Sequence, residues 1–553
     1  MSVYPAALPT VRPAVRSAFE QGSGGGAASI IAGLFAQGQQ GFWLPFTDFA
    51  SLTQDSAGTL PYTALEQPVG LILDKSKGGG RGPELSPNGG TFDDAAGWTI
   101  TQPTSSISGG VLNVGAGACD IFPPTASVVA GKSYEVTFTI SNSTANYGIR
   151  ILNRDIIGSG NYFPAGAQYI TANGSYRFVC VAISNGSIGV NRVSGHTGSL
   201  QVDNFSVKEI PGNHASQVTS TARGVVSARV NQLTATEALS AAPWSASGGA
   251  TVTDGGAGSS TITFAGGVGA VTQSVASLPA AQSLGATFLL SVIANTAARV
   301  LYWGGATAAG TDVVTITPIG GGEWLQTVAR TFTTTVGGSP QFQINNSAAG
   351  NGAVVTVRAC SFVLSNQAAL PYQRVTTPTD YDAVGFPKYL RLDGTDDFYT
   401  CGGGGSTTGF YYSDVIRPMG GAGTRRVIWS DRSGNNGYEL AINASDKLEF
   451  SAGNGAAITT VASTVSATVA EGKRYEVMDD GAVLSVQIDG SSPVTVARPV
   501  VTAGSSTITL YRGASTGYFN GQITEPIYRA GTPPSAYERE VIRNYQSQKA
   551  GML

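Results

Sequence analysis

Residues 41–77 read GFWLPFTDFASLTQDSAGTLPYTALEQPVGLILDKSK, and this stretch decides the fold. Its apolar run PVGLILD is followed by a loop of lysines and glycines, as expected for a strand that ends in a turn. The natural continuation, GNHASQVTSTARGV, comes only at 212–225, and the completing segment KYLRLDGTDDFYTC starts at Lys388. We therefore predict one β-sandwich whose sequence is interrupted by two inserted modules.

The composition indicates many short strands joined by tight turns. The chain has 553 residues, which is too long for one hydrophobic core, so we expect several domains. Charged residues make up 12%, about half of the ~25% usual in soluble domains. The 74 glycines and 26 prolines accompany an ordinary hydrophobic content of 42%. Intrinsic disorder would need more charge and fewer apolar residues, so it is excluded.

Charge and hydropathy exclude two kinds of partner. The formal net charge is −3, whereas binding to nucleic acid needs clustered Lys and Arg. No uninterrupted apolar run is long enough to cross a bilayer. The start of the chain has no continuous apolar segment either, so we expect no secretory signal. We therefore expect neither nucleic-acid binding nor membrane insertion.

The four cysteines are far apart in the sequence and show no C-x-x-C spacing, which argues against zinc. Cys119 and Cys180 fall in one predicted module, where they form either a disulfide or two buried thiols. Because nothing signals secretion, we favour two buried thiols.

The two inserted modules repeat one plan. Trp98 opens the first module, Trp244 holds the corresponding place in the second, and each module closes with an alternating strand. This repetition indicates a diverged internal duplication. We place the boundaries at 1–39 (N-terminal arm and linker), 40–81 (first part of the sandwich), 82–210 (first insert), 211–232 (sandwich continuation), 233–366 (second insert) and 367–553 (main part of the sandwich with a C-terminal helix).

The N-terminal arm carries a proline at every fourth position, which forbids a regular helix there. After a flexible glycine-rich linker, the apolar segment 29–38 is either a short helix or a buried strand. We expect this region to dock onto another protein, and a frayed terminus is the alternative. The candidate docking residues are Pro5, Pro9, Arg12, Pro13, Arg16 and Phe19.

A helix is predicted at the other end, over 536–550. Ser535 supplies its start and Gly551 its stop. An apolar stripe along it consists of Tyr537, Val541 and Tyr545.

From about Gly41 onward the chain resembles a family of bacteriophage and prophage tail or structural proteins. The segments that carry the resemblance are FTDFASLTQDSAGTLPYTALEQPVGLILDKS (46–76), GNHASQVTSTARGVVSARVNQL (212–233), LRLDGTDDFY (390–399) and FNGQITEPIYRAGTPPSAYEREVIRNY (519–545). In that family they form a split laminin-G-like, concanavalin-A-like jelly roll. The first insert is similar to carbohydrate-binding-module jelly rolls of such proteins. The second departs from that pattern, because Ala359 and Cys360 replace the Asp203-Asn204 pair.

The resemblance implies an all-β fold of several jelly-roll sandwiches with one C-terminal helix. It implies a structural protein of the virion, made in the host cytoplasm, most simply a tail fibre or appendage that binds host surface polysaccharide. The arm would attach it to other virion proteins, and family analogy suggests a homotrimer. The alternatives are a capsid decoration or head fibre with a purely structural role, and a polysaccharide depolymerase.

We expect no catalytic activity. A glycosidase needs two facing carboxylates, and the nearest approach is Glu476 with Asp480, which we interpret as solvated charges at a strand end. The chain has two histidines, His196 and His214, and we interpret His214 as a structural hydrogen-bonding residue.

Carbohydrate binding needs aromatic faces beside polar side chains. Candidates in the main sandwich are Trp429, Asp431, Arg432, Asn435, Asn436, Tyr438, Tyr511, Arg512 and Tyr518. For Trp429 and Tyr438 the alternative is a place in the sandwich core. Candidates in the first insert are Tyr147, Tyr162 and Trp98, of which Trp98 is the one we favour as core. No cofactor is expected beyond a structural calcium ion, with Asp203, Asn88 and Asp93 as oxygen ligands.

Overall fold

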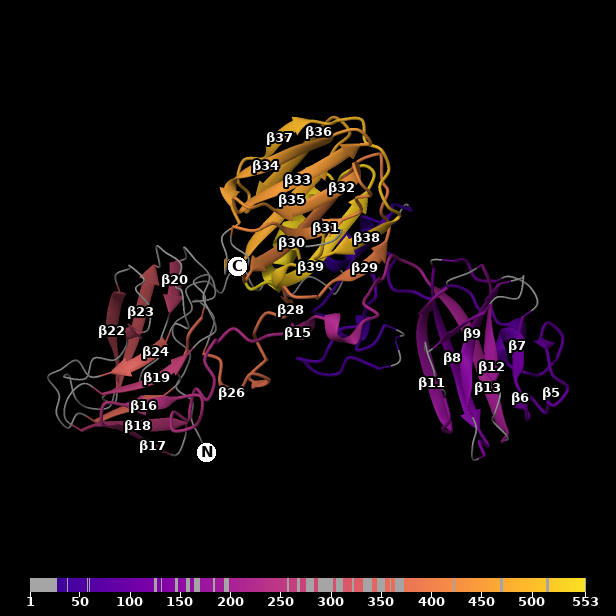
Figure 1. Cartoon of the computed structure of the whole chain (residues 1–553), viewed down its shortest axis with the longest axis horizontal. Coiled ribbons are helices and arrows are strands. Elements are labelled where there is room, and N and C mark those ends of the chain that lie inside the picture. The colour runs from indigo at the N-terminus through magenta and orange to yellow at the C-terminus, as the bar shows by residue number, and fades with distance from the viewer. Residues whose placement is uncertain are drawn as a thin grey trace.

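The computed structural model shows a protein built of antiparallel β-sheets (Figure 1). In Figure 1 a central lobe, mainly orange and yellow with some indigo, lies between two lobes formed by the middle of the chain. The all-β prediction is confirmed. The described residues are 27–36, 38–56, 58, 60–123, 127–130, 132–144, 148–155, 160–163, 170–182, 185–192, 198–255, 258–265, 269–274, 283–286, 302–304, 312–320, 323–331, 341–345, 354–358, 360–363, 372–420, 423–467, 471–513 and 517–552.

The central sandwich consists of two sheets, to which three separate segments of the chain contribute. Sheet A has the order β15 (Val225–Ser227), β28 (Tyr389–Asp393), β39 (Asn520–Ala530), β30 (Phe410–Pro418), β35 (Lys473–Asp479), β36 (Val483–Ile488) and β37 (Val494–Ala497), with β1 (Gly41–Trp43) also paired to β39. Sheet B has the order β2 (Leu52–Thr53), β3 (Leu71–Ile72), β14 (Ala215–Ser216), β29 (Tyr399–Gly402), β38 (Thr507–Leu510), β31 (Arg426–Ser430), β32 (Asn436–Ile442), β33 (Lys447–Asn454) and β34 (Ile458–Ser466).

Aromatic side chains fill the space between these sheets. Alternation along each strand turns every second side chain inward. The ring of Phe410 lies 5.2 Å from that of Trp429 and 4.8 Å from that of Tyr438, measured between centroids. Tyr528 on β39 packs against Trp429 at 5.6 Å. The core of the molecule therefore lies between β30 and β39 of sheet A and β31 to β33 of sheet B.

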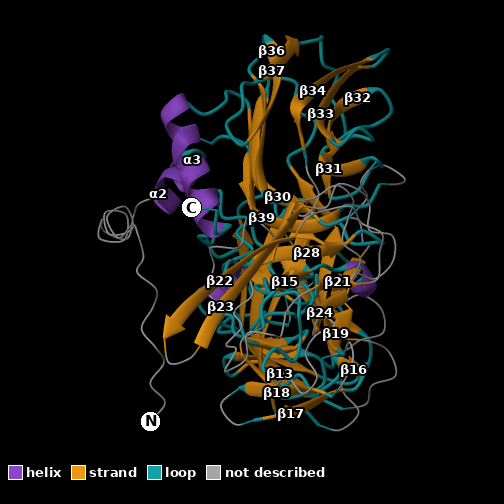
Figure 2. Ribbon diagram, turned by 90° about the vertical axis from the view of Figure 1, so that its left-hand side faces the viewer, coloured by secondary structure: helices purple, strands orange, loops and turns teal. Residues whose placement is uncertain are grey.

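Two helices cover the outer face of sheet A, side by side in Figure 2. They are α2 (Ala27–Gly33) and α3 (Ala536–Lys549). Ile31 and Phe35 are buried against Tyr411 and Ile542. The apolar N-terminal segment is thus a helix followed by a turn, and its apolar side packs on sheet A and α3. No helix in the described ranges is long and apolar enough to span a membrane.

The C-terminal helix begins where the sequence indicated. Ser535 accepts a hydrogen bond from the backbone N–H of Glu538, whose carboxylate accepts in return from the backbone N–H of Ser535. The predicted stripe is partly wrong, because Tyr537 is 71% exposed while Ile542 is fully buried. The helix meets the sheet obliquely, on the side of Ile542 and Tyr545.

The first insert is a sandwich of two five-stranded sheets. One has the order β10 (Gly160–Phe163), β9 (Ile149–Asp155), β12 (Gly186–Arg192), β7 (Cys119–Phe122) and β4 (Thr99–Ile100). The other has the order β11 (Gly174–Val181), β8 (Ser133–Ser141), β13 (Leu200–Ile210), β6 (Val111–Val114) and β5 (Ser106–Ser108). Cys119 and Cys180 lie on opposite sheets as buried free thiols, so the disulfide alternative is wrong. Leu71 and Leu73 of the central sandwich pack against Val179 and Ile210 of the insert.

The second insert has three smaller sheets. Their orders are β16 (Ser245–Ser247), β19 (Ala270–Ser274), β24 (Gln341–Asn345), β21 (Tyr302–Gly304); β17 (Ala250–Asp254), β18 (Ser259–Phe264), β25 (Val354–Arg358); and β20 (Ser283–Ala286), β23 (Glu323–Thr331), β22 (Asp312–Gly320). Trp244 is buried against Phe342, with ring centroids 5.5 Å apart. In the first insert, Trp98 packs in a similar way against Phe92 and Phe205.

Buried polar residues join each insert to the central sandwich. At the first junction, the Asp74 carboxylate accepts from the backbone N–H groups of Trp43 (2.8 Å) and Asn213 (2.7 Å). At the second, the Asn231 amide donates to the carbonyl oxygens of Cys360 and Gln373, both at 3.0 Å. The chain therefore enters and leaves each insert through one hydrogen-bonded point. Short elements near these points are η1 (Phe49–Ser51), η2 (Pro87–Gly90), η3 (Ser220–Ala222), β26 (Val375–Thr377) and β27 (Asp380–Tyr381).

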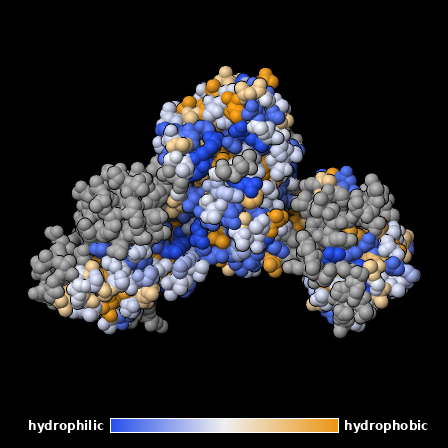
Figure 3. All heavy atoms as spheres, in the orientation of Figure 1, coloured by the Kyte–Doolittle hydropathy of each residue, from blue (hydrophilic) through white to orange (hydrophobic). Residues whose placement is uncertain are grey.

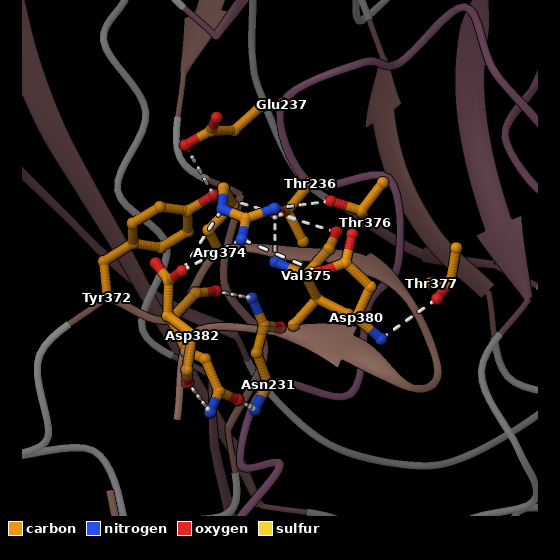
Figure 4. Close-up of polar contacts among 11 residues, drawn as sticks. Asn231, Thr236, Glu237, Tyr372, Arg374, Val375, Thr376, Thr377, Asp380 and Asp382 are labelled. Carbon is orange, nitrogen blue, oxygen red and sulfur yellow. Dashed lines mark hydrogen bonds and ion pairs between the residues drawn. The ribbon is translucent and has the colours of Figure 1, made fainter. Parts of the chain in front are cut away.

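Figure 4 shows the outer part of the second junction. Arg374 lies between two carboxylates, at 3.1 Å from Asp382 and 3.8 Å from Asp380. The hydroxyl of Tyr372 lies 2.8 Å from that of Thr236 and donates to Glu237 at 3.3 Å. These contacts link the segment that enters the insert to the segment that leaves it.

Candidate functional site

Two connections between the sheets lie side by side at one end of the central sandwich. β28 and β39 pair in sheet A up to Asp393 opposite Asn520. β29 and β38 pair in sheet B with Tyr399 opposite Leu510. The loop that joins β28 to β29 therefore leaves the sheets next to the loop that joins β38 to β39. This pairing brings together residues that are more than a hundred positions apart in the sequence.

Phe398, Arg512 and Tyr518 meet where these loops touch, and we call them the aromatic–arginine cluster. The Cζ atom of Arg512 lies 3.8 Å from the ring centroid of Phe398 and 6.0 Å from that of Tyr518. The two ring centroids are 6.4 Å apart, with their planes at 53°. All three side chains are half-buried. The cluster thus presents aromatic surface and a cation to solvent.

Arg512 is held by the rings and not by an acid. Its Nε atom is buried and has no hydrogen-bond partner. In the part of the chain that the structure describes, the guanidinium makes no ion pair within 4.0 Å. The positive charge of Arg512 therefore has no acid partner among the described residues, and a polar ligand could supply one.

A buried glutamine fixes one side of the cluster. Gln217, which follows β14, donates from Nε2 to the carbonyl oxygen of Phe398 at 2.8 Å. The next residue, Val218, is 76% exposed.

An acidic loop lies next to the cluster. Carboxylate oxygens of Asp393, Asp396 and Asp397 all lie within 4.8 Å of one another, and among the described residues this is the group of acids that could hold a metal ion. Asp397 Oδ2 accepts from the backbone N–H of Asp393 at 2.8 Å. Burial, helped by the charges of Asp393 and Asp396, raises the pKa of Asp397 to about 6. Hard oxygen ligands of this kind suit Ca²⁺.

Three aromatic residues of the predicted sugar site are core residues instead. Trp429 is 1% exposed, and Tyr438 and Tyr511 are fully buried. The prediction that their rings stack on a sugar is wrong, because all three side chains belong to the core between the two sheets. For Trp429 and Tyr438 the core alternative is the correct one.

The polar residues predicted beside them lie at the other end of β38. Asp431 is buried, and its carboxylate accepts from the backbone N–H groups of Tyr438 (2.6 Å) and Gly405 (2.8 Å), so it fixes two loops. Burial raises the pKa of Asp431. Asn435 is exposed and donates to the carbonyl oxygen of Ala456, whereas Asn436 is half-buried.

Arg432 lies in the same turn, 3.5 Å from Glu439. Because Asp431 adjoins the start of β38 and Arg512 follows its end, the predicted residues do not form one site. The structure places Arg512 and Tyr518 together at one end of β38, and the turn that carries Asp431 and Arg432 at the other.

Several other predicted positions fall outside the described residues. Among them are Tyr147 of the first insert, the side chain of Tyr162 on β10, and His196. The same holds for the docking residues Pro5, Pro9, Arg12, Pro13, Arg16 and Phe19. These predictions remain predictions.

The predicted calcium ligands lie on two segments that pack together. η2, which contains Asn88, approaches β13 so closely that a Cβ atom on Gly90 would lie 2.1 Å from the carbonyl oxygen of Phe205. Asp203 is at a β-bulge of β13 and accepts from the backbone N–H of Asn204 at 2.7 Å. Asn88 and Asp93 are exposed. Calcium binding at this place stays a prediction.

The two carboxylates considered for catalysis have other partners. Glu476 is buried beneath α3 and accepts two hydrogen bonds from Arg543. Asp480 lies in the turn after β35, where it accepts from the backbone N–H groups of Ala482 and Val483, both at 2.8 Å.

His214 is a structural residue, as interpreted from the sequence. Its Nδ1 atom accepts from the backbone N–H of Asp74 at 2.8 Å, and its Nε2 atom lies 3.0 Å from the carbonyl oxygen of Ile210. With a backbone donor at Nδ1 and a carbonyl acceptor at Nε2, the imidazole is neutral with its proton on Nε2. Burial lowers the pKa of His214.

Phe398 is the member of the cluster that sequence analysis missed. It lies in LRLDGTDDFY, which was noted only for its resemblance to other proteins. A signal was present, since a large aromatic residue directly follows an acidic turn. Its proximity to Tyr518 depends on strand register, which the sequence does not reveal.

Comparison with known proteins finds only distant structural similarity. No protein-family model and no curated protein match the chain. The receptor-binding domain of botulinum neurotoxin type G is 12% identical over 29% of this chain and 42% of that chain, with a TM-score of 0.23. Botulinum neurotoxin type C, whose cell entry depends on interaction with two ganglioside molecules, is 14% identical over 31% and 43%, with a TM-score of 0.23.

Domains LG4-5 of the mouse laminin α1 chain are 10% identical over 82% of this chain and 98% of that chain, with a TM-score of 0.23. This chain spans less than half the length of the two toxin chains.

Proposed function

We propose that this chain is a carbohydrate-binding protein whose central sandwich holds the sugar at the aromatic–arginine cluster. The observation that carries the proposal is Arg512, half-buried between Phe398 and Tyr518 without an acid partner. Sugars present C–H faces that pack on aromatic rings and hydroxyl groups that pair with charged and polar side chains. Both kinds of contact are available at this one surface. Figure 3 shows largely hydrophilic atoms with separate hydrophobic patches over the central lobe, which suits a polar ligand.

The proposed setting is the virion of a bacteriophage, in a tail fibre or appendage rather than on the capsid. Support comes from the resemblance of residues 46–76 and 390–399 to phage virion proteins. The buried free thiols suit synthesis in the host cytoplasm. We further propose a homotrimer, because many copies of a weak site on one particle raise the overall affinity for a polysaccharide.

Binding without cleavage is the proposed mode of action. Glu476 is neutralised by Arg543, and Asp480 accepts backbone hydrogen bonds in a turn. Neither carboxylate is placed to act as a general acid on a bound sugar.

The test is binding of full-length protein to intact bacteria and to their extracted surface polysaccharide, with the size of the polysaccharide followed over time. Wild-type protein should bind without shortening the polysaccharide, and Tyr518→Ala should weaken binding at least about tenfold. The matched control is Tyr537→Ala, since Tyr537 is an exposed tyrosine on α3.

Three other outcomes of this experiment would contradict the proposal. Equal binding by Tyr518→Ala and wild-type protein would place the sugar elsewhere. No binding to any polysaccharide would favour a purely structural decoration, and shortening would establish an enzyme.

Attachment to the particle is tested by deletion of residues 1–26. This truncation leaves α2 in place, so the packing of Ile31 and Phe35 on sheet A is retained. The truncated protein should keep its melting temperature and be absent from purified particles. Normal incorporation would refute the proposed docking role of the arm.

A further inference from the structure

We infer that the aromatic–arginine cluster selects sugars that carry an anionic group, either a carboxylate or a sulfate or phosphate ester. This inference rests on the proposed function and adds the chemical class of the ligand. It follows from how Arg512 differs from other arginines of the central sandwich.

Several other arginines of this sandwich have their charge matched by an acid of the protein itself. Arg498 lies 2.7 Å from Asp479, Arg425 lies 2.7 Å from Glu439, and Arg391 lies 2.9 Å from Glu66. Where no acid is near, backbone oxygens serve instead. Arg229 donates to the carbonyl oxygens of Asn231 (2.9 Å) and Gln232 (2.8 Å).

Arg512 has neither kind of acceptor in the described part of the chain. Two acids of the neighbouring loop have backbone partners, because Asp397 accepts from the backbone of Asp393, and Asp393 accepts from the backbone of Thr395 at 2.7 Å. The guanidinium plane is instead packed against Phe398, at 3.8 Å from the ring centroid. Stacking on a ring fixes the plane of the guanidinium without using its N–H groups.

An anionic group on the ligand would supply what the protein omits. A guanidinium binds a carboxylate or an ester oxyanion through two parallel hydrogen bonds, and such bonds are shorter and stronger than those to a neutral hydroxyl. The guanidinium of Arg512 is half-buried, so a charge-assisted bond from its terminal N–H groups to an anion is less weakened by water than on an open surface. Tyr518 remains beside the cation to pack against the sugar ring.

The acidic loop weakens the attraction of Arg512 for an anion that is still at a distance. The carboxylates of Asp393 and Asp396 oppose the long-range attraction of an anion. We therefore expect the selectivity to come from direct contact with Arg512 and to disappear when its charge is removed.

The test uses the full-length protein and three oligosaccharides of equal length: an oligogalacturonate, a sulfated galactan oligosaccharide and a neutral galactan oligosaccharide. Calorimetry should show that the wild-type protein binds one or both anionic probes about tenfold more tightly than the neutral one. The two anionic probes distinguish a carboxylate from an ester. Arg512→Gln should bring all three affinities within about twofold of one another. Arg512→Lys keeps the charge but loses the planar pair of donors, so it should retain only part of the preference.

The control is Arg432→Gln, which removes an arginine from the other end of β38 and should leave the preference unchanged. Equal affinity for the three probes, or an unchanged preference in Arg512→Gln, would overturn the inference. In that case, if the neutral probe binds and its affinity depends on Tyr518, the proposed sugar-binding function stands and only the preference for anionic sugars fails. If none of the probes and no surface polysaccharide binds, both fail together.

Discussion

Arg543 on α3 forms a two-point ion pair with Glu476 on β35: Nε lies 2.9 Å from one carboxylate oxygen and Nη2 lies 2.9 Å from the other. The side chains are only 22% and 9% exposed, so the pair lies in the contact between helix and sheet. It is the main charged contact that holds α3 to β35. The same contact explains why Glu476 is not available as a catalytic acid.

Arg543→Ala should therefore lower the free energy of unfolding by about 2 kcal/mol, because it leaves a buried carboxylate without its partner. Glu540→Gln is the control, since Glu540 is 60% exposed and lies 3.6 Å from the same arginine. That change should stay within about 0.5 kcal/mol. Both are measured by thermal or urea unfolding. An Arg543→Ala protein as stable as the wild type would show that α3 is held by its apolar contacts alone.

Trp429 and Tyr518 should behave in opposite ways when replaced by alanine. Trp429 is 1% exposed and packs against Phe410 and Tyr528, so Trp429→Ala should cost about 3–5 kcal/mol of stability. Tyr518 is half-buried at the surface, so Tyr518→Ala should cost about 1 kcal/mol or less but reduce sugar binding. The measurements are unfolding curves and binding of the same protein preparations. A stable Trp429→Ala protein that has lost binding would restore Trp429 as a ligand contact.

The strands of the central sandwich could be predicted from the sequence, but the contacts between their side chains could not. Alternating strands such as 438–442 and 447–452 could be predicted, because burial of one face imposes a period of two. The period does not say which side chains face the core, and a β-bulge between Val427 and Trp429 shifts the alternation just before the predicted sugar site. Trp429 was therefore assigned both to the core and to a ligand site.

Contacts between distant segments account for the other differences. Phe398 and Tyr518 meet because β28 pairs with β39 and β29 pairs with β38, and no local pattern encodes these registers. The apolar side of α2 was recognised, but not that Tyr411 and Ile542 cover it. A pattern shows that a surface must be buried, whereas the partner is set by the whole fold.

Asp397 predicts a pH dependence of stability. Burial raises its pKa from 3.8 to about 6, so between these values the folded protein holds a proton that the unfolded chain has lost. The free energy of unfolding contributed by this group is therefore full below about pH 4 and falls as the pH rises through 6. Asp397→Asn has no such titration. Its stability relative to wild type should rise by roughly 2 kcal/mol between pH 4 and pH 7, measured by urea unfolding. A difference that does not change with pH would contradict this.

Gln373 should be the most sensitive residue at the junction with the second insert. It is fully buried, and its amide uses four contacts: Oε1 accepts from the backbone of Val230 and Asn231, and Nε2 donates to the carbonyl oxygens of Ala228 and Asp382. Gln373→Ala would leave these four backbone groups without partners in a dry place. We expect a loss of about 3 kcal/mol or more in the stability of this junction.

Limited proteolysis measures that loss directly, because an opened junction exposes the segments around Asn231 and Asp382 to cleavage. Gln373→Ala should be cut there well before the wild-type protein, while the central sandwich stays intact. Gln373→Glu should be no better, since a carboxylate keeps the two acceptor contacts but faces two carbonyl oxygens with negative charge. Gln40→Ala is the matched control, because Gln40 is exposed and its side-chain amide donates to the carbonyl oxygen of Gly38 at 3.3 Å. If Gln373→Ala resists proteolysis as well as Gln40→Ala, the apolar contacts of Val230 with Val363 and Phe386 are sufficient to hold the insert in place.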